Sequence, residues 1–243
     1  MKAVYIEEQG GIEKLIYGER PEPKVGPGEV LVKIRATALN HLDIYARAGL
    51  NGVSVGGFPR ILGSDIAGEV VELGKGITQA RNGDRVIVEN SIKCGVCKYC
   101  SMSRDELCTN PKGLGVTVDG GYAEYVKVPA SIVHDIPHWM PFDEGAAIGL
   151  VYHTAWHCLI TRAQLKPGED ILITAAGSGV GSAAIQLAKR IGARVITTAG
   201  TDEKLEKARE LGADEVINYV KEERYSDKVK ALTEGEGVDM VLD

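Results

Sequence analysis

The sequence predicts an α/β protein whose first half is a compact, partly closed β-barrel and whose second half is a parallel, doubly wound sheet. Residues 1–130 contain short β-rich stretches that glycine and proline interrupt. Beyond about residue 140, short apolar strands alternate with helix-forming stretches of about ten to fifteen residues. A chain of 243 residues with 44% hydrophobic composition is long enough to bury the core of one large domain or of two modest ones.

Alternation of apolar and polar residues identifies the strands of the first half. Residues 29–39 alternate clearly, and residues 68–74 and 84–90 are further short strands. One side of the first stretch carries Val30, Val32, Ile34 and Ala36, and the other carries Leu31, Lys33 and Arg35. Proline and glycine in residues 21–29 predict a turn, and residues 41–50 predict a single helix.

The second half alternates between strands and helices. Strands are predicted over residues 170–176, 194–200, 214–220 and 238–243, and helices over residues 180–193, 202–213 and 224–235. The first helix carries Val180, Ala184, Leu187, Ala188 and Ile191 on one face. The connector around Ile136 to Glu144 is rich in proline and turn formers, so we place the domain boundary there, between residues 1–135 and 136–243.

Charge and hydropathy exclude several classes of protein. A net charge of −6 gives the chain no attraction to nucleic acid or to anionic lipid. The uncharged runs 145–161 and 171–188 are shorter than the ~20 apolar residues that span a bilayer, so they are interpreted as core segments. The N-terminus lacks the pattern of a secretory signal, which predicts a cytoplasmic protein.

A glycine-rich turn follows the first strand of the second half. Residues 175–181 read Ala-Ala-Gly-Ser-Gly-Val-Gly, a variant of the G-x-G-x-x-G pattern. Small residues there let the backbone approach a pyrophosphate, which the first-turn N–H groups of the helix would bind. The predicted cofactor-binding residues of this turn are Gly177, Ser178, Gly179, Val180 and Gly181. The alternative is an ordinary tight turn between a strand and a helix.

The end of the next strand indicates which dinucleotide is bound. An acid at that position would accept hydrogen bonds from the ribose of NAD, but residues 198–201 read Thr-Ala-Gly-Thr. Thr201 can donate a hydrogen bond to a 2′-phosphate, and Lys204 supplies a positive charge, so we predict NADP(H). The nearby acids Asp202 and Glu203 argue for the other cofactor, and Lys204 is alternatively an ordinary solvated residue.

Four of the five cysteines lie within residues 94–108. Cys94, Cys97, Cys100 and Cys108 have the spacing C-x2-C-x2-C-x7-C, which suits a closed, tetrahedral and therefore structural zinc site. An iron–sulfur cluster is the main alternative, although the fourth cysteine lacks a following proline. Cys158, outside this group, is interpreted as a small buried hydrophobic residue.

Together these features resemble the medium-chain dehydrogenase/reductase superfamily over essentially the whole chain. Similar segments are FPRILGSDIAGEV, GGYAEYVKVP, TAW and AAGSGVGSAAIQLAK, together with the cysteine lobe. The resemblance implies a GroES-like first domain that carries the structural zinc lobe. It also implies a Rossmann domain that binds the nicotinamide cofactor.

The resemblance also implies that the catalytic zinc of alcohol dehydrogenases is absent. Asn40 stands where a cysteine ligand belongs, Ser64 where a histidine belongs, and Leu150 near the third ligand. A zinc ion would polarise the carbonyl of the substrate, whereas an enone or a quinone accepts hydride without a metal. The chain therefore resembles the zinc-free quinone oxidoreductase and enone reductase branch. A zinc-type alcohol dehydrogenase is the alternative.

In that branch, Asn40, Asp43 and Tyr45 match an N-x-x-D-x-Y segment that lines the active site. The resemblance implies that Asn40 and Tyr45 hydrogen-bond the developing oxygen of the product. It places His41 at the cofactor pyrophosphate, and Val151 and Thr154 beside the nicotinamide. Structural roles are the alternatives: Asn40 as a turn residue, Asp43 as a hydrogen-bond acceptor and Tyr45 as an amphipathic helix residue.

The sequence ends on what we interpret as the fourth strand of a sheet that has six in a full fold of this type. We therefore expect a shortened chain, and a zinc- and nucleotide-binding fragment without turnover is the alternative of another class. The expected partner is a small molecule: a quinone, an enone or an aldehyde. No nucleic-acid or membrane partner is expected, and a homodimer and a homotetramer are both compatible with the sequence.

Overall fold

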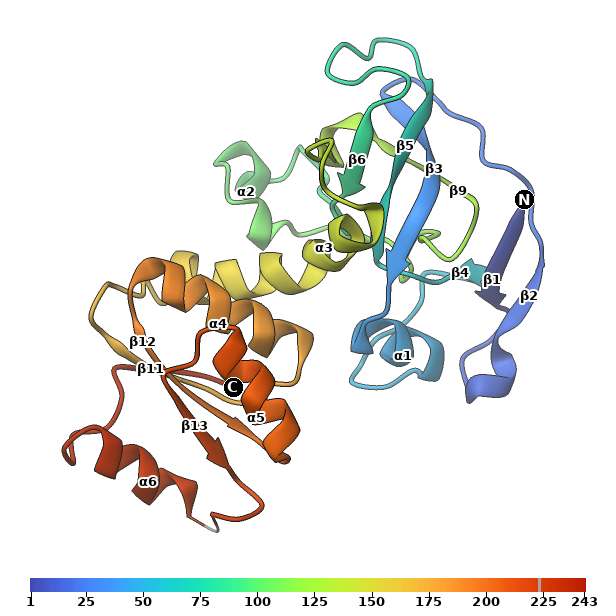
Figure 1. Ribbon diagram of the computed structural model, residues 1–243. Helices are drawn as coiled ribbons and strands as arrows, with labels where there is room; N and C mark the ends of the chain where they lie inside the picture. The colour runs from blue at the N-terminus through green and yellow to red at the C-terminus, as the bar shows by residue number, and fades with distance from the viewer. Residues whose placement is uncertain (223) are drawn as a thin grey trace. The chain divides into compact units, whose positions relative to one another are not determined.

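The computed structural model describes residues 1–222 and 224–243 and divides into two compact units, Met1–Leu150 and Val151–Asp243 (Figure 1). It confirms the predicted α/β fold, with antiparallel sheets in the first unit and a parallel sheet in the second. Residues 136–150, which the sequence assigns to the second domain, group with the first unit. The position of the domain boundary stays a prediction.

A five-stranded antiparallel sheet forms the centre of the first unit. Its order is β10 (Val133–Asp135), β6 (Arg85–Val88), β5 (Asp65–Leu73), β3 (Glu29–Ala38) and β9 (Tyr125–Pro129). Val30 and Val32 enter the core as the alternation predicts, but Leu31 is buried as well. The register of β3 on β5 shifts at two places along the strand, so strict alternation breaks down.

Smaller elements surround this sheet. Three strands pair in the order β2 (Ile16–Glu19), β1 (Lys2–Ile6) and β4 (Arg60–Ile61), and β7 (Ser91–Ile92) pairs with β8 (Lys112–Gly113). The predicted helix is α1 (His41–Ala48), and a short α2 (Lys98–Ser101) lies within the cysteine lobe. The 3-10 turns are η1 (Ile12–Lys14), η2 (Asp105–Leu107) and η3 (Ala130–Ile132).

Helix α3 (Phe142–Trp156) begins in the first unit and continues into the second, where a π-helical segment, η4 (His157–Arg162), follows it. Its first part packs closely on the central sheet, because a Cβ placed on Gly145 would lie 3.4 Å from Ile87 and 3.6 Å from Ala67. None of the helices in the described residues is long and apolar enough to cross a membrane.

The second unit is a four-stranded parallel sheet. Its order is β13 (Glu215–Asn218), β12 (Arg194–Ala199), β11 (Asp170–Ile173) and β14 (Met240–Leu242). This is the order 3-2-1-4, the central part of the doubly wound nucleotide-binding sheet. The helices are α4 (Gly179–Ile191), α5 (Asp202–Glu210) and α6 (Tyr225–Leu232), so every helix and strand predicted for residues 170–243 is present.

Alternate side chains of the strands meet helices on opposite faces of this sheet. Ile171 and Ile173 of β11 pack with α4 and α5, whereas Leu172 packs with Val229 of α6. Successive side chains of a strand point to opposite faces, and helices cover both faces of this sheet. Every residue of the strand can therefore be apolar, which explains the continuous apolar stretches in the sequence. Because β11 and β12 are parallel neighbours, their carboxyl ends lie side by side. The glycine turn begins at the end of β11.

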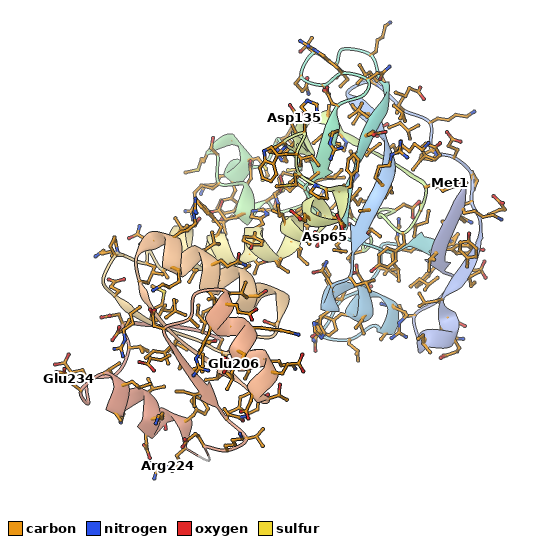
Figure 2. The ribbon with its side chains drawn as sticks, in the orientation of Figure 1. Met1, Asp65, Asp135, Glu206, Arg224 and Glu234 are labelled. Atoms are coloured by element: carbon orange, nitrogen blue, oxygen red, sulfur yellow. The ribbon has the colours of Figure 1, made fainter. Side chains whose placement is uncertain are left out.

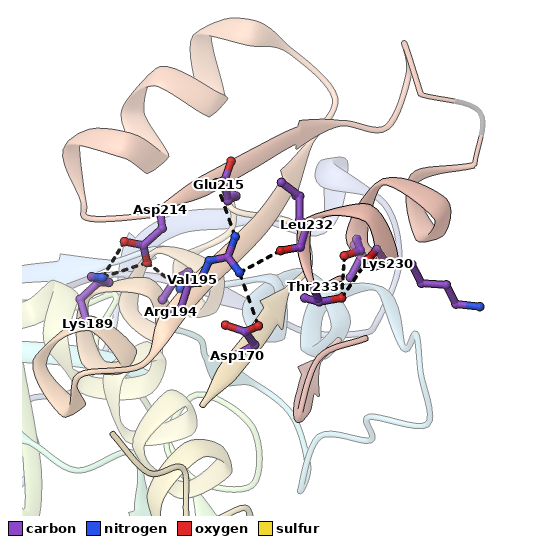
Figure 3. Close-up of polar contacts among 10 residues, drawn as sticks. Asp170, Lys189, Arg194, Val195, Asp214, Glu215, Lys230, Leu232 and Thr233 are labelled. Carbon is purple, nitrogen blue, oxygen red and sulfur yellow. Dashed lines mark hydrogen bonds and ion pairs between the residues drawn. The ribbon is translucent and has the colours of Figure 1, made fainter. Parts of the chain in front are cut away.

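Arg194 ties the opposite, amino-terminal edge of the same sheet together (Figure 3). It donates to the carbonyl oxygen of Leu232 at 2.9 Å and lies 3.5 Å from Asp170 and 3.6 Å from Glu215. Asp170, Arg194 and Glu215 each begin a strand, so one guanidinium links three strands and the end of α6. Because its side chain is 37% exposed, we assign these pairs a modest contribution to stability.

Candidate functional site

Asn40 lies at the junction of β3 and α1, as the residue that caps the helix. It forms a capping box with Asp43, and the main-chain N–H of Asn40 donates to Asp43 Oδ2 at 2.8 Å. Such a box supplies partners to N–H groups that the first turn of a helix leaves unpaired. The start of α1 therefore fixes both residues through local hydrogen bonds.

Asp43 accepts two further hydrogen bonds from distant parts of the first unit. The hydroxyl of Ser64 lies 3.1 Å from its Oδ1, and the hydroxyl of Tyr122 lies 2.8 Å from its Oδ2. Burial and the adjacent Asp43 carboxylate strongly raise the pKa of Tyr122, which stays a neutral donor. Asp43 thus accepts hydrogen bonds from three donors and is only 6% exposed. It fixes the positions of Asn40, Ser64 and Tyr122 relative to one another.

Asp65 is the second buried carboxylate of this region and lies at the start of β5 (Figure 2). Its Oδ2 accepts from Asn40 Nδ2 at 2.8 Å, and its Oδ1 accepts from the main-chain N–H of Leu150 at 2.7 Å. Burial raises the pKa of Asp65, and the neighbouring Asp43 carboxylate acts in the same direction. A Cβ on Gly149 would overlap Asp65 Oδ1, so glycine is required for this approach.

These hydrogen bonds join the three positions where the resemblance places zinc ligands. Asn40 and Leu150 both donate to Asp65, while Ser64 donates to Asp43. The donors are an amide, a main-chain N–H and a hydroxyl, none of which supplies the thiolate and imidazole ligands of a catalytic zinc site. Among the described residues, the four cysteines of residues 94–108 form the only group suited to hold a metal ion.

Asn40, His41 and Asp43 also line a cavity of about 340 Å³ in the first unit. The rest of its lining is mainly apolar and includes Leu15, Leu39, Ile44, Leu62 and Tyr122. Tyr45 is not part of this lining, and its ring lies beside His41 with a centroid distance of 6.2 Å. The structure thus brings Asn40, Asp43 and His41 to one cavity, and Tyr45 is not among the residues that line it.

The cysteine lobe has the geometry of a tetrahedral metal site. The Sγ atoms of Cys94, Cys97, Cys100 and Cys108 all lie within 4.8 Å of one another. Cys97 and Cys100 are 3.6 Å apart and Cys94 and Cys100 are 3.9 Å apart. A zinc ion with Zn–S bonds of about 2.3 Å requires Sγ separations of about 3.8 Å. The donor set therefore fits zinc with no coordination position left for a substrate.

Main-chain N–H groups favour thiolates in this lobe. Donors from Cys100 and Thr109 lower the pKa of Cys97 to about 5, and the N–H of Cys94 lowers the pKa of Cys108. Burial and the neighbouring Cys97 thiol raise the pKa of Cys100 to about 12, so that sulfur loses its proton only when metal binds, since deprotonated sulfur is the form that binds metal.

The glycine turn lies between β11 and α4, as predicted. Ser178 caps the helix, because its Oγ accepts from the N–H of Gly181 at 2.9 Å. A Cβ on Gly181 would overlap the carbonyl oxygen of Ala175, which itself has a left-handed φ of 53°. The turn is therefore tight enough to require glycine, and the N–H groups at the start of α4 are the groups that bind anions in such turns.

Thr201 and Lys204 lie at the start of α5, beyond the end of β12. Thr201 caps this helix by accepting from the N–H of Lys204 at 3.4 Å. The alkyl part of Lys204 lies over the glycine turn, where a Cβ on Gly177 would be 2.9 Å from its Cδ. Asp202, by contrast, pairs with Lys221 and accepts from Asn218, which lowers the pKa of its carboxyl. Its carboxylate is thus engaged elsewhere.

Val151 and Thr154 lie on α3 within the second unit. A Cβ on Gly179 would lie 2.7 Å from Val151 Cγ1, so Val151 packs against the glycine turn. Thr154 is exposed. Their predicted contacts with the nicotinamide, and that of His41 with the pyrophosphate, stay predictions.

Sequence reasoning missed the roles of Asp65 and Tyr122. Both lie in segments that resemble the superfamily, FPRILGSDIAGEV and GGYAEYVKVP, but their hydrogen bonds cross 25 and 79 residues of the chain. Gly149 carried a usable signal, because glycine in the interior of a helix is unfavourable unless packing requires it.

A parallel nucleotide-binding sheet, a capped glycine turn and a β-rich unit with a closed four-cysteine site define the class of zinc-containing, nicotinamide-dependent oxidoreductases. Residues 26–138 match the family "Alcohol dehydrogenase GroES-like domain", and residues 179–243 match "Zinc-binding dehydrogenase". The chain belongs to the medium-chain dehydrogenase/reductase superfamily, which includes alcohol dehydrogenases and quinone oxidoreductases.

Individual relatives support this assignment. A "NAD-dependent alcohol dehydrogenase" of Sulfolobus acidocaldarius is 37% identical over all of this chain and 70% of its own length. The human "Quinone oxidoreductase" is 32% identical over all of this chain and 66% of its own length. A solved "NAD-dependent alcohol dehydrogenase" superimposes with a TM-score of 0.94 and 41% identity, over 99% of this chain and 70% of that one.

Proposed function

We propose that this chain carries the functional residues of an NADPH-dependent oxidoreductase that transfers hydride to an enone, a quinone or a similarly activated carbonyl compound. The observation that carries the proposal is the hydrogen bonding of Asn40 and Leu150 to the buried carboxylate of Asp65. At positions where a catalytic zinc site would have its ligands, these residues form hydrogen bonds instead, and hydrogen bonds supply no Lewis acid. Such a site favours substrates whose own conjugation disperses the negative charge that hydride transfer creates.

The substrate would bind through its oxygen. Asn40 has two hydrogens on Nδ2 and directs one to Asp65, which leaves the other for a ligand in the cavity. Donation to the oxygen of an enone stabilises the enolate that forms when hydride adds to the β-carbon. A proton then adds to the α-carbon, so that one enone and one proton accompany each NADPH consumed.

Asp43 and Tyr45 have different roles in this proposal. Asp43 accepts from Asn40, Ser64 and Tyr122, so it holds the site in shape rather than exchanging a proton with the substrate. Tyr45 adjoins His41 and would join the substrate site as a second donor. We keep both as proposed site residues, together with His41 at the cofactor pyrophosphate.

The nucleotide would bind at the glycine turn of the second unit. NADPH supplies the hydride when bound. Thr201 and Lys204 favour its 2′-phosphate, because no ion pair involves Lys204 among the described residues, and Asp202 is engaged with Lys221. Two of the relatives reported above are named as NAD-dependent, so NADH is the competing cofactor. Zinc in the cysteine lobe would stabilise the fold without contacting the hydride.

The experiment compares substrates and cofactors on the 243-residue chain. Loss of reduced-nicotinamide absorbance is followed with a quinone, an enone and a simple aldehyde, each with NADPH and with NADH. We expect faster turnover of the quinone or the enone than of the simple aldehyde, each with NADPH. Faster reaction with NADH would contradict the choice of cofactor.

A zinc-type alcohol dehydrogenase is the second candidate, which the names of two relatives favour. Oxidation of simple alcohols that depends on a second zinc ion per chain would establish it. A chain that binds zinc and NADPH but reduces none of the compounds would instead be a binding module. We also propose a cytoplasmic location, because the four cysteines must stay reduced to bind zinc.

A further inference from the structure

We infer that Asp65 is a positioning residue that takes over the ordering role of a metal ion and fixes which way the amide of Asn40 points. The inference rests on the proposed function, because Asn40 is taken there as the donor to the substrate oxygen. Asp65 lies outside the N-x-x-D-x-Y segment, and its task in this inference is to orient the side-chain amide of Asn40.

The first step concerns the polarity of the carboxylate. An ionised carboxylate only accepts hydrogen bonds, so Asp65 Oδ2 can pair with the Nδ2 side of Asn40 and not with its Oδ1. A neutral amide or a hydroxyl at position 65 could pair with either side. The charge on Asp65 therefore selects one of the two orientations of the Asn40 amide.

The second step concerns rigidity. Asp65 is 1% exposed, and the hydroxyl of Thr37 donates to its carbonyl oxygen at 2.6 Å. Its second carboxylate oxygen is held by the N–H of Leu150 on α3. The carboxylate is thus held from α3, whereas Thr37 contacts only the main chain of Asp65, and Asn40 is bound to a buried, fixed support.

The third step concerns the other contacts of Asn40. Its main-chain N–H is bound to Asp43, so the backbone and the side chain of one residue are held by two different carboxylates. With both ends held, the remaining Nδ2 hydrogen has a defined direction. A substrate oxygen would find a preorganised donor rather than a rotating amide, which is the condition for efficient stabilisation of developing charge.

A pair of variants separates this role from a merely structural one. Asp65→Asn has one acceptor for two donors, so the Asn40 amide must turn over or lose its partner. The double variant Asn40→Asp with Asp65→Asn restores both hydrogen bonds, because the new amide accepts from Leu150 and donates to the new carboxylate. In the double variant, the side chain of residue 40 is a carboxylate and has no N–H to donate to the substrate. Thr37→Val is the matched control, since it removes a hydrogen bond to the main chain of Asp65 only.

We expect kcat for the enone to fall about tenfold to a hundredfold in Asp65→Asn, with NADPH affinity unchanged. In the double variant we expect the Leu150 amide to regain its protection from hydrogen exchange, while kcat stays low. Wild-type kcat in Asp65→Asn would overturn the inference. So would recovery of kcat in the double variant, because Asp65 would then act through structure alone.

The side-chain amide signals of Asn40 in an NMR spectrum provide a readout that does not depend on activity. In the wild type they should be shifted and slow to exchange, and Asp65→Asn should move them, while Thr37→Val should not. Unchanged signals in Asp65→Asn would overturn the inference even if the enone is reduced. Failure to reduce any enone, with the NMR result as expected, would refute the proposed function and leave the positioning role of Asp65 intact.

Discussion

The hydroxyl of Tyr122 donates to the buried carboxylate of Asp43 across 2.8 Å, so a residue just before β9 holds the first turn of α1. Replacing Tyr122 by Phe leaves this carboxylate with one donor fewer. We expect a loss of about 1–3 kcal/mol in the free energy of unfolding, measured by urea denaturation. Tyr17→Phe is the control, because that side chain is 72% exposed. Equal losses in both variants would show that the hydrogen bond does not stabilise the protein.

Removal of a zinc ligand should unfold the cysteine lobe. We expect metal analysis to find one zinc ion per chain in the wild type and none in Cys97→Ser, with the loss of protection from proteolysis confined to residues 94–108. Binding of a structural zinc contributes about 10–16 kcal/mol in small zinc peptides, so the loss of local order should be complete. Cys158→Ser should retain its zinc. A lobe that stays protected without metal would refute the structural role.

Lys204 should decide between the two cofactors. A charge-assisted hydrogen bond to a 2′-phosphate is worth about 1.5–3 kcal/mol, so Lys204→Ala should bind NADPH about tenfold to a hundredfold more weakly. Binding of NADH should be unchanged. The control is Lys207→Ala on the same helix, whose ammonium group pairs with Glu203 at 2.8 Å. Fluorescence titration measures both dissociation constants, and parallel loss of the two cofactors would remove Lys204 from the phosphate site.

Gly181 should tolerate no side chain. In Gly181→Ala the new methyl group overlaps the carbonyl oxygen of Ala175, so the turn must open. We expect a loss of about 1–3 kcal/mol in the free energy of unfolding, together with loss of NADPH binding. Ser182→Ala, at the next position of α4, should bind NADPH normally. Tight binding by Gly181→Ala would mean that the phosphates do not use this turn.

The raised pKa of Asp65 predicts how stability depends on pH. Between the ordinary pKa of an aspartate, about 3.9, and the raised value, the native state keeps a proton that the unfolded state has released. The contribution of Asp65 to stability therefore falls as pH rises through this interval and is constant above it. Asp65→Asn lacks this group, so its stability relative to wild type should rise over the same interval. Urea denaturation between about pH 4 and pH 7 tests the sign. Thr37→Val should follow the wild type throughout.

Local pattern was sufficient to predict the helices and strands of residues 170–243 and part of the first unit. The strands β11 and β12 and the helices α4 and α5 follow from hydrophobic period and capping residues such as Ser178 and Thr201, which act within a few residues of the chain. The strands β1, β2, β9 and β10 were not predicted. Nor were the two-residue strands β4, β7 and β8, because so short a stretch carries no periodic signal. The π-helical segment η4 likewise has no local signature.

The candidate site was predictable in part. The cysteine lobe follows from spacing alone, since all four ligands lie within residues 94–108. The hydrogen bonds of Asp65 to Asn40 and Leu150 cross 25 and 85 residues, and no pattern in one sequence indicates which buried donors such an acid meets. The resemblance predicted which positions would carry zinc ligands, and the structure shows that Asn40 and Leu150 donate to Asp65 there.

Gly149 lets Asp65 approach α3, and this has a consequence for how the site tolerates substitution. Asp65 accepts a hydrogen bond from the amide of Asn40, and its carboxylate lies where a side chain on residue 149 would be. Changing Asn40 or Asp65 alone leaves a buried polar group without a partner, and a side chain at position 149 overlaps Asp65. A single substitution at position 40, 65 or 149 therefore loses a buried hydrogen bond or creates an overlap, so we expect these three positions to tolerate change only in combination.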